Sequence, residues 1–269
     1  MNTARSAECQ VISLANQKGG VAKSFTTANL AVGLVNKGKK VLVIDNDPQG
    51  HASRCLGVRK PEISIYDIMG KLVRGEDIEP GEGIVKTAEG VDLLPANVKY
   101  AMMELELSSA MSREHLLKEF VVMERPFYDY ILIDCPPNLG LFVINALTAS
   151  DSVLIPVKLE DLSIDGLQQL IQTIGMARRR LNSDLFINGI LFTIVEQNTV
   201  LAKTSMEAIK DAYGEHVHIF DCIIPKSTKA AECPGSGVSI FKYDPKGKVA
   251  AAYETLTKEV IVNGSKSSN

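Results

Sequence analysis

The sequence has no long apolar run. No apolar segment among the 269 residues approaches the about 18 residues that a membrane-spanning helix needs. The opening stretch MNTARSAECQ also has no apolar segment of the length found in signal peptides. We therefore expect a cytoplasmic protein that does not associate with a membrane.

Paired cysteines and a strong net charge are missing as well. The five cysteines are scattered and form no C-x-x-C pair, which indicates reduced thiols rather than a disulfide framework. The formal net charge is −3, so the chain is not a polycation. Any contact with nucleic acid must therefore use a local basic patch.

What the sequence does contain is a regular alternation of apolar segments and helical patterns. The apolar segments are short, rich in Val, Ile and Leu, and mostly without alternating polarity, as is typical of parallel strands covered on both faces. The predicted strands are 10–16, 40–45, 91–96, 129–134, 152–157, 186–195 and 218–225. The predicted helices are 23–37, 64–74, 112–124, 140–149, 163–181, 200–213 and 247–262.

This alternation predicts an α/β fold with a doubly wound, mainly parallel sheet and helices on both faces. A chain that is 45% hydrophobic is long enough to bury a large core as one domain. We expect that domain to span residues 1–262, and we expect the polar segment 263–269 to be a disordered tail.

Two glycines are missing from the segment that most resembles a phosphate-binding loop. Aligning Lys23 and Ser24 with the end of the pattern G-x-x-x-x-G-K-[ST] puts Gln17 and Ala22 where that pattern has glycine. The loop still joins a strand to the N-terminus of a helix, where backbone N–H groups and the helix dipole attract anions. Lys23 can reach terminal phosphates and Ser24 can offer a hydroxyl to Mg²⁺. The extra methyl of Ala22 is one that the start of a helix can accommodate.

Carboxylates follow two further predicted strands. Asp45 ends the strand in VLVIDNDPQGHAS, and Asp47 stands just beyond it in a loop. Asp134 ends the strand in YDYILIDCPPNLG. Carboxylates that leave strands beside a phosphate loop can order Mg²⁺ and a water molecule. Cys135 has no neighbouring cysteine motif and is predicted to be a packed thiol rather than a nucleophile or metal ligand.

The three segments together resemble the ParA/MinD superfamily of ATPases. KGGVAKS is similar to its deviant Walker A motif, the DNDPQ segment to its D-x-D-P-Q switch, and DCPPNLG to its D-C-P-P-x-L-G segment. The resemblance implies a P-loop ATPase of the deviant Walker A class that requires ATP and Mg²⁺. In the family, glycine is commoner at position 22 and threonine at positions 24 and 25.

The resemblance also implies roles for individual residues. It implies that Lys18 reaches the phosphates of a partner subunit across a nucleotide-sandwich dimer, and that Asp47 positions the attacking water. The catalytic residues it implies are Lys18, Lys23 and Asp47. The implied ATP-binding residues are Lys18, Gly19, Gly20, Val21, Ala22, Lys23, Ser24, Phe25, Pro225 and Ser227. The implied magnesium site comprises Ser24, Asp45 and Asp134, with the aspartates acting through water.

The C-terminal part resembles the partition-protein branch of this superfamily. The segment beginning IIPKSTKAAECP is similar to the family's I-P-R-N-x-R-x-x-E-A-P, which stacks on adenine and carries DNA-binding arginines. Lys226 and Lys229 replace those arginines, and Asn198 stands where an upstream arginine is common. The resemblance therefore implies non-specific DNA binding through Lys226 and Lys229.

The function that this resemblance implies is that of a DNA partition ATPase. ATP would drive a homodimer that binds DNA and the nucleoid, and a ParB-like centromere-binding protein would stimulate hydrolysis. The motif begins within about 20 residues of Met1, which leaves no room for an N-terminal helix-turn-helix domain of the usual size. Three alternatives stay open: a MinD-like positioning ATPase, a ParA-like protein that positions other cargo such as a conjugation assembly, and an iron–sulfur ATPase.

Overall fold

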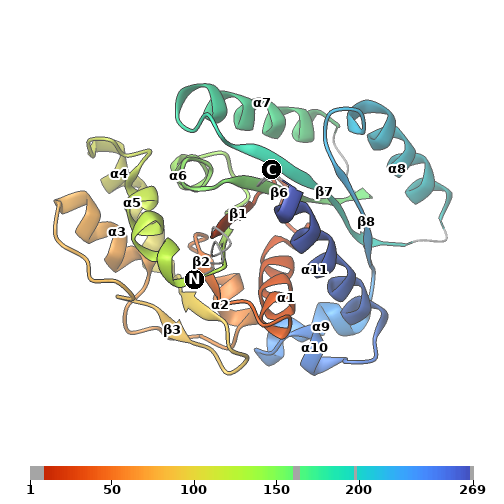
Figure 1. Ribbon diagram of the computed structural model, residues 1–269, viewed down its shortest axis with the longest axis horizontal. Helices are drawn as coiled ribbons and strands as arrows, with labels where there is room; N and C mark the ends of the chain where they lie inside the picture. The colour runs from red at the N-terminus through yellow and green to blue at the C-terminus, as the bar shows by residue number, and fades with distance from the viewer. Residues whose placement is uncertain (1–8, 160–163, 197–198, 267–269) are drawn as a thin grey trace, which may run out of the picture.

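The computed structural model describes residues 9–159, 164–196 and 199–266, and the strands of these residues form one sheet of eight (Figure 1). The strands are β1 (Gln10–Leu14), β2 (Val41–Asp45), β3 (Val85–Lys86), β4 (Asp92–Leu94), β5 (Tyr130–Asp134), β6 (Ser152–Lys158), β7 (Phe186–Val195) and β8 (Ile219–Pro225). Their order across the sheet is β3-β4-β2-β5-β1-β6-β7-β8. All neighbours are parallel except β3 and β4.

Helices cover both faces of this sheet (Figure 1). The longer ones are α1 (Lys23–Asn36), α3 (Ile65–Arg74), α5 (Leu116–Glu124), α6 (Leu141–Ala149), α7 (Ile164–Arg180), α8 (Val200–Tyr213), α9 (Thr228–Ser236) and α11 (Lys248–Lys266). The shorter ones are α2 (His51–Cys55), α4 (Met103–Ser109), α10 (Ile240–Tyr243) and the 3-10 turns η1 (Val98–Met102) and η2 (Arg125–Phe127). The predicted doubly wound, mainly parallel α/β fold is confirmed.

Each face of the sheet has its own apolar core. One core packs side chains of the strands against α3 to α8, and the other packs them against α1, α2, α9, α10 and α11. Every residue of β1, β2 and β5 except Gln10 is buried, because helices press on these central strands from both sides. This burial is why the strands read as continuous apolar segments rather than as alternating ones.

The differences from the predicted elements are at short or terminal segments. All seven predicted strands are present, but the two-residue β3 was not predicted, nor were the helices α2, α4, α9 and α10. Helix α11 continues to Lys266, so residues 263–266 are helical rather than part of a disordered tail, and residues 267–269 lie outside the described residues. Among the described residues, no helix has both the length and the hydropathy that crossing a bilayer requires.

Candidate nucleotide-binding site

The loop between β1 and α1 has two residues in the left-handed region. Gly20 has φ +75° and Ala22, the residue just before the first turn of α1, has φ 60° and ψ 30°. Left-handed backbone is easy for glycine and costly for alanine, which explains why the usual motif has glycine at position 22. Our expectation that Ala22 adds only a methyl at a helix start is wrong, because the cost arises in its backbone.

Lys23 lies beneath this loop. Only 7% of the residue is exposed, and its Nζ donates a hydrogen bond of 3.1 Å to the carbonyl of Lys18. Burial lowers the pKa of Lys23, while the negative charges of Asp134 and Asp47 oppose that shift. The Lys18 side chain is exposed instead, so the two lysines that the motif predicts face different surroundings.

The carboxyl ends of three central strands meet next to Lys23. Asp134 at the end of β5 pairs in register with Leu14 of β1 and with Asp45 of β2. Asp45 and Asp134, which are far apart in the sequence, are therefore neighbours in the sheet, as the parallel pairing of their strands requires.

Asp134 is fully buried at this edge. The hydroxyl of Thr27 donates to its Oδ1 at 3.1 Å, whereas its Oδ2 has no hydrogen-bond partner among the described residues. Burial and the negative charge of Asp45 together raise the pKa of Asp134 to about 8, against the opposing effects of the Ser24 hydroxyl and the positive charge of Lys23. A buried carboxylate oxygen without a donor, close to a hydroxyl, is suited to a hydrated divalent cation. The residues present therefore fit Mg²⁺ at Asp134 and Ser24.

Asp45 differs from Asp134 because its oxygens are occupied. Its Oδ2 accepts hydrogen bonds from the backbone N–H and the hydroxyl of Ser53, and its Oδ1 accepts one of 3.3 Å from the Asp47 N–H. Burial raises the pKa of Asp45 to about 6, in spite of the hydrogen bonds from Ser53. These contacts hold the β2–α2 loop. Of the two aspartates at the predicted magnesium site, it is therefore Asp134 that has a carboxylate oxygen without a hydrogen-bond partner among the described residues.

Asp47 lies in that loop, facing a cavity of about 570 Å³. It is 6% exposed, and its Oδ1 accepts a hydrogen bond of 2.9 Å from the Gln49 N–H. The predicted residues that line this cavity are Gly19, Gly20, Ala22, Lys23, Ser24, Phe25 and Asp47. Sequence reasoning missed four polar residues of its wall: Gln49, His51, Arg54 and Arg59. The last three belong to or follow α2, which was itself not predicted.

A second cavity of about 960 Å³ adjoins the first and shares Gly20, Ala22, Phe25 and Pro234 with it. Its surface is mostly apolar and is formed by the ends of β7 and β8, by α9 and by Tyr253 of α11. The predicted residues Pro225 and Ser227 line it. Phe25 packs edge to face against Tyr253, with ring centroids 5.7 Å apart. Pro225 and Ser227, remote in sequence from the phosphate loop, thus lie beside it.

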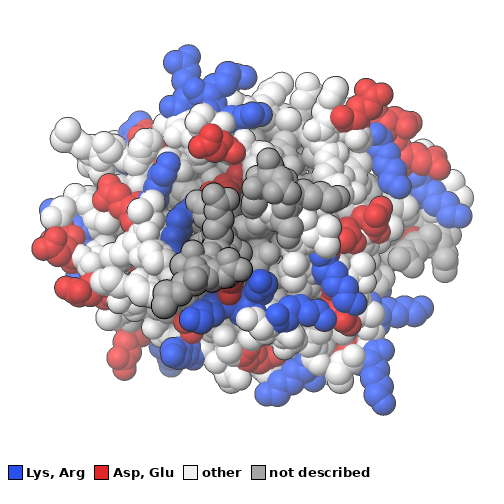
Figure 2. Space-filling model, viewed as in Figure 1, with Lys and Arg blue, Asp and Glu red and all other residues white. Residues whose placement is uncertain are grey.

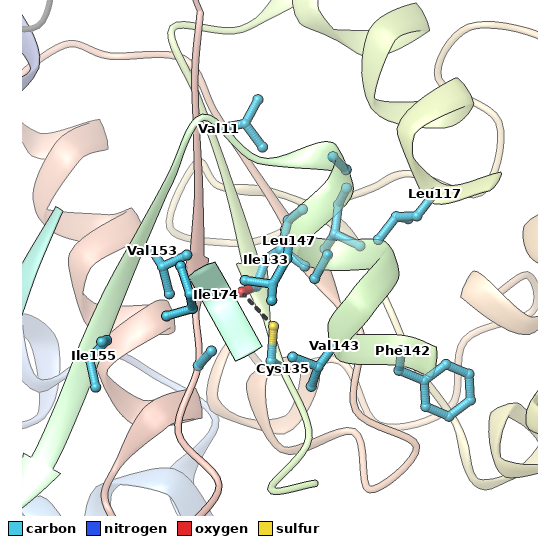
Figure 3. Close-up of a cluster of buried hydrophobic side chains, with 14 of the residues drawn as sticks. Val11, Leu117, Ile133, Cys135, Phe142, Val143, Leu147, Val153, Ile155 and Ile174 are labelled. Atoms are coloured by element: carbon cyan, nitrogen blue, oxygen red, sulfur yellow. Dashed lines mark hydrogen bonds between the residues drawn. The ribbon is translucent and has the colours of Figure 1, made fainter. Parts of the chain in front are cut away.

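Val21 and Cys135, which belong to the predicted motifs, line neither of these two cavities. Val21 is buried, and its carbonyl accepts a hydrogen bond of 3.0 Å from the hydroxyl of Thr193. Cys135 is fully buried in an apolar cluster with Ile133 and Val143 (Figure 3). Burial also raises its pKa above the usual range of a thiol, so it is the packed thiol that the sequence predicts.

The two predicted DNA-binding lysines follow β8, Lys226 just after the strand and Lys229 in α9. Lys226 lines the cavity and forms an ion pair with Glu196, and Lys229 forms one of 2.8 Å with Asp244. Figure 2 shows lysine and arginine side chains gathered where α9, α10 and α11 lie, with acidic side chains among them. The basic patch that contains Lys226 and Lys229 is thus partly neutralised, because both lysines form ion pairs with acidic side chains. Asn198, the counterpart of an upstream arginine, lies outside the described residues.

Comparisons with known proteins agree with this architecture. A family model described as an AAA domain matches residues 9–187. The chain is 42% identical over 259 residues to the sporulation initiation inhibitor protein Soj of Bacillus subtilis, covering 95% of the chain and 99% of Soj. It is 34% identical over 256 residues to the chromosome partitioning protein ParA of Caulobacter vibrioides, covering 94% of each.

A solved structure of the same fold contains a nucleotide. It is the cobyrinic acid a,c-diamide synthase from Mycobacterium smegmatis with bound ADP and magnesium, which superimposes with a TM-score of 0.82. The two sequences are 31% identical, and the match covers 97% of each chain.

Proposed function

The chain belongs to the ParA/Soj family of partition ATPases, and from that membership we propose that it is a Mg²⁺-ATP-dependent partition ATPase. The observation that carries the proposal is that Lys23 and Asp47 line one cavity, with the buried Asp134 interacting with Lys23 behind it, and that this cavity adjoins an apolar one. A nucleotide needs both parts, a cationic cradle for its phosphates and an apolar pocket for its base.

Each of the two cavities receives a different part of the nucleotide. The triphosphate occupies the 570 Å³ cavity, where Lys23 and the N–H groups at the start of α1 neutralise its charge. The base occupies the 960 Å³ cavity beside Pro225 and Ser227. Phe25 lies where the cavities meet and holds the sugar end of the nucleotide apart from solvent.

The catalytic roles follow from burial and contacts. Ser24, and Asp134 through water, would hold Mg²⁺, which would supply neutralisation of charge on the phosphate oxygens. Asp45 supports this site by fixing the loop through Ser53. Asp47, held by the Gln49 N–H, orients the attacking water from the rim of the phosphate cavity.

Dimerisation, DNA binding and partner stimulation are the further parts of the proposal. The exposed side chain of Lys18 reaches the phosphates of a second copy, so that ATP drives a sandwich homodimer. The dimer brings together two copies of the patch with Lys226 and Lys229, and binds DNA without sequence preference. A ParB-like centromere-binding protein then stimulates hydrolysis and resets the monomer. In the cell, the protein is cytoplasmic and associates with the nucleoid.

The first experiment is binding to a random-sequence duplex at low salt, with ATP and Mg²⁺, with ADP, and without nucleotide. The proposal predicts binding with ATP only, together with a doubling of mass in light scattering. Lys18→Ala should keep nucleotide binding but lose the doubling of mass and the DNA binding. Tight ATP binding by a dimer that does not bind DNA would refute the DNA-partition part of the proposal and favour the positioning of another cargo.

A further inference from the structure

The end of β7 contains a residue in an unusual conformation beside the larger cavity. Ile194 has φ 55°, in the left-handed region. β-branched residues are rarely found there, because the branched side chain crowds the backbone. A residue held in that conformation is maintained by its surroundings, and such residues cluster at functional sites.

The pairing of β7 with β8 shows why Ile194 is held there. Phe192 pairs with Ile223 and Val195 pairs with Pro225, so β7 advances three residues while β8 advances two. β7 therefore carries one extra residue, which is a β-bulge. Bulges are common beside active sites, where they change the direction of a side chain.

The bulge changes which side of the sheet each residue faces. From Ile190 to Phe192 the side chains alternate, with Ile190 and Phe192 in the core under α3 to α8 and Leu191 in the opposite core. Regular alternation would put Ile194 in the first of these cores and Val195 in the second. Instead Val195 lies in the first core, although it also borders the cavity, and Ile194 lines the cavity without belonging to either core.

Contacts on both sides of Ile194 fix this arrangement. The hydroxyl of Thr193 donates to the carbonyl of Val21 in the phosphate loop at 3.0 Å. The carbonyl of Val195 accepts a hydrogen bond of 3.1 Å from the Lys226 N–H. Ile194 itself is only partly buried, although its neighbours Thr193 and Val195 are buried. Its uncovered surface therefore faces the cavity.

We propose that Ile194 is a base-contact residue whose side chain the bulge turns into the cavity to pack against the purine ring. The proposal rests on the proposed function, because it assumes that this cavity receives the base of ATP. An apolar side chain here, with Pro225 from the adjacent strand, gives the planar ring an apolar surface without demanding a hydrogen bond. Ile194 contributes to affinity for the base and not for the phosphates.

The test uses two variants and two probes. Ile194→Ala removes most of the side chain and keeps the strain, whereas Ile194→Gly removes the side chain and accepts the left-handed backbone. Each is titrated with ATP and with inorganic tripolyphosphate, a probe that has no base. Ile187→Ala is the matched control, because Ile187 is a partly buried residue of the same strand that does not line the cavity.

Both Ile194 variants should bind ATP about 10-fold more weakly, as expected for the loss of apolar contact with a ligand. Their affinity for tripolyphosphate should equal that of the unmodified protein, which also shows that the phosphate site is folded. ATP affinity restored in Ile194→Gly would mean that only the backbone matters, and would overturn the inference. A protein that binds neither probe, even unmodified, would instead overturn the proposed function.

Discussion

The carboxylate of Asp45 accepts two hydrogen bonds from Ser53, one of 2.7 Å from the backbone N–H and one of 2.6 Å from the hydroxyl. The oxygen of the same hydroxyl accepts a third hydrogen bond, of 3.1 Å, from the Ala96 N–H. Ser53 thus links the end of β2 to α2 and to the segment after β4. Asp47 lies in the loop that this link closes.

Replacing Ser53 with alanine should destabilise the protein and slow its turnover. The change leaves the buried Ala96 N–H without its acceptor and removes one donor from Asp45, which costs about 1–3 kcal/mol of the free energy of unfolding. Turnover should fall more than ATP affinity, because the loop positions Asp47 and not the phosphate cradle. Urea denaturation and steady-state ATPase kinetics measure the two effects. Ser108→Ala, which alters an exposed hydroxyl bonded to Leu105, is the control. Equal losses of kcat in both variants would contradict the prediction.

Ala22→Gly should stabilise the protein. Ala22 has a left-handed backbone, and relieving it is worth about 1 kcal/mol. The same substitution at Ala31 in the middle of α1 should destabilise by a similar or larger amount, because glycine weakens a helix interior and a buried methyl is lost. Opposite signs for the two variants in chemical denaturation are the expected result. A loss of stability in Ala22→Gly would show that the methyl contributes more than the strain costs.

The sequence predicted the sheet and most of the phosphate cavity because both depend on local signals. Continuous apolar segments mark strands buried on both faces, and lysine and serine at a strand–helix junction mark a phosphate loop. The aspartates at strand ends could also be assembled, since carboxyl ends of parallel strands share one edge of the sheet.

What the sequence could not predict depends on contacts between distant segments. The bulge at Ile194 can be recognised only from the pairing of β7 with β8, because the segment FTIV (192–195) has no residue that indicates a bulge. Helix α9 contains Pro234, which lowers any helical prediction for its segment, and it forms because the segment packs against α2. The occupied oxygens of Asp45 likewise depend on Ser53, whose position α2 determines.

Protonation of Asp134 should make the stability of the nucleotide-free protein depend on pH. Its pKa is raised from 3.8 to about 8 in the folded state, mainly by burial. The folded state therefore binds a proton that the unfolded state releases, so the free energy of unfolding should fall as the pH rises between these values. Urea denaturation at about pH 5 and pH 8 measures this change. Asp134→Asn should remove this part of the pH dependence, whereas Asp77→Asn, at an exposed position, should leave it unchanged. Identical pH profiles for all three proteins would contradict the assignment.

The ion pair between Lys226 and Glu196 should restrain DNA binding. Glu196→Gln removes a negative charge beside Lys226, so in the ATP state it should strengthen binding to random-sequence DNA. Lys226→Ala should weaken that binding and lower the slope of log affinity against log salt by about one. The matched controls are Glu82→Gln and Lys71→Ala, which alter an ion pair next to the β3 edge, at the other end of the sheet from β8. These controls change the net charge by the same amounts, so a general electrostatic effect would move them equally. If Glu196→Gln and Glu82→Gln shift DNA affinity alike, the patch at Lys226 is not the binding surface, and the paired lysines serve only the local structure around α9.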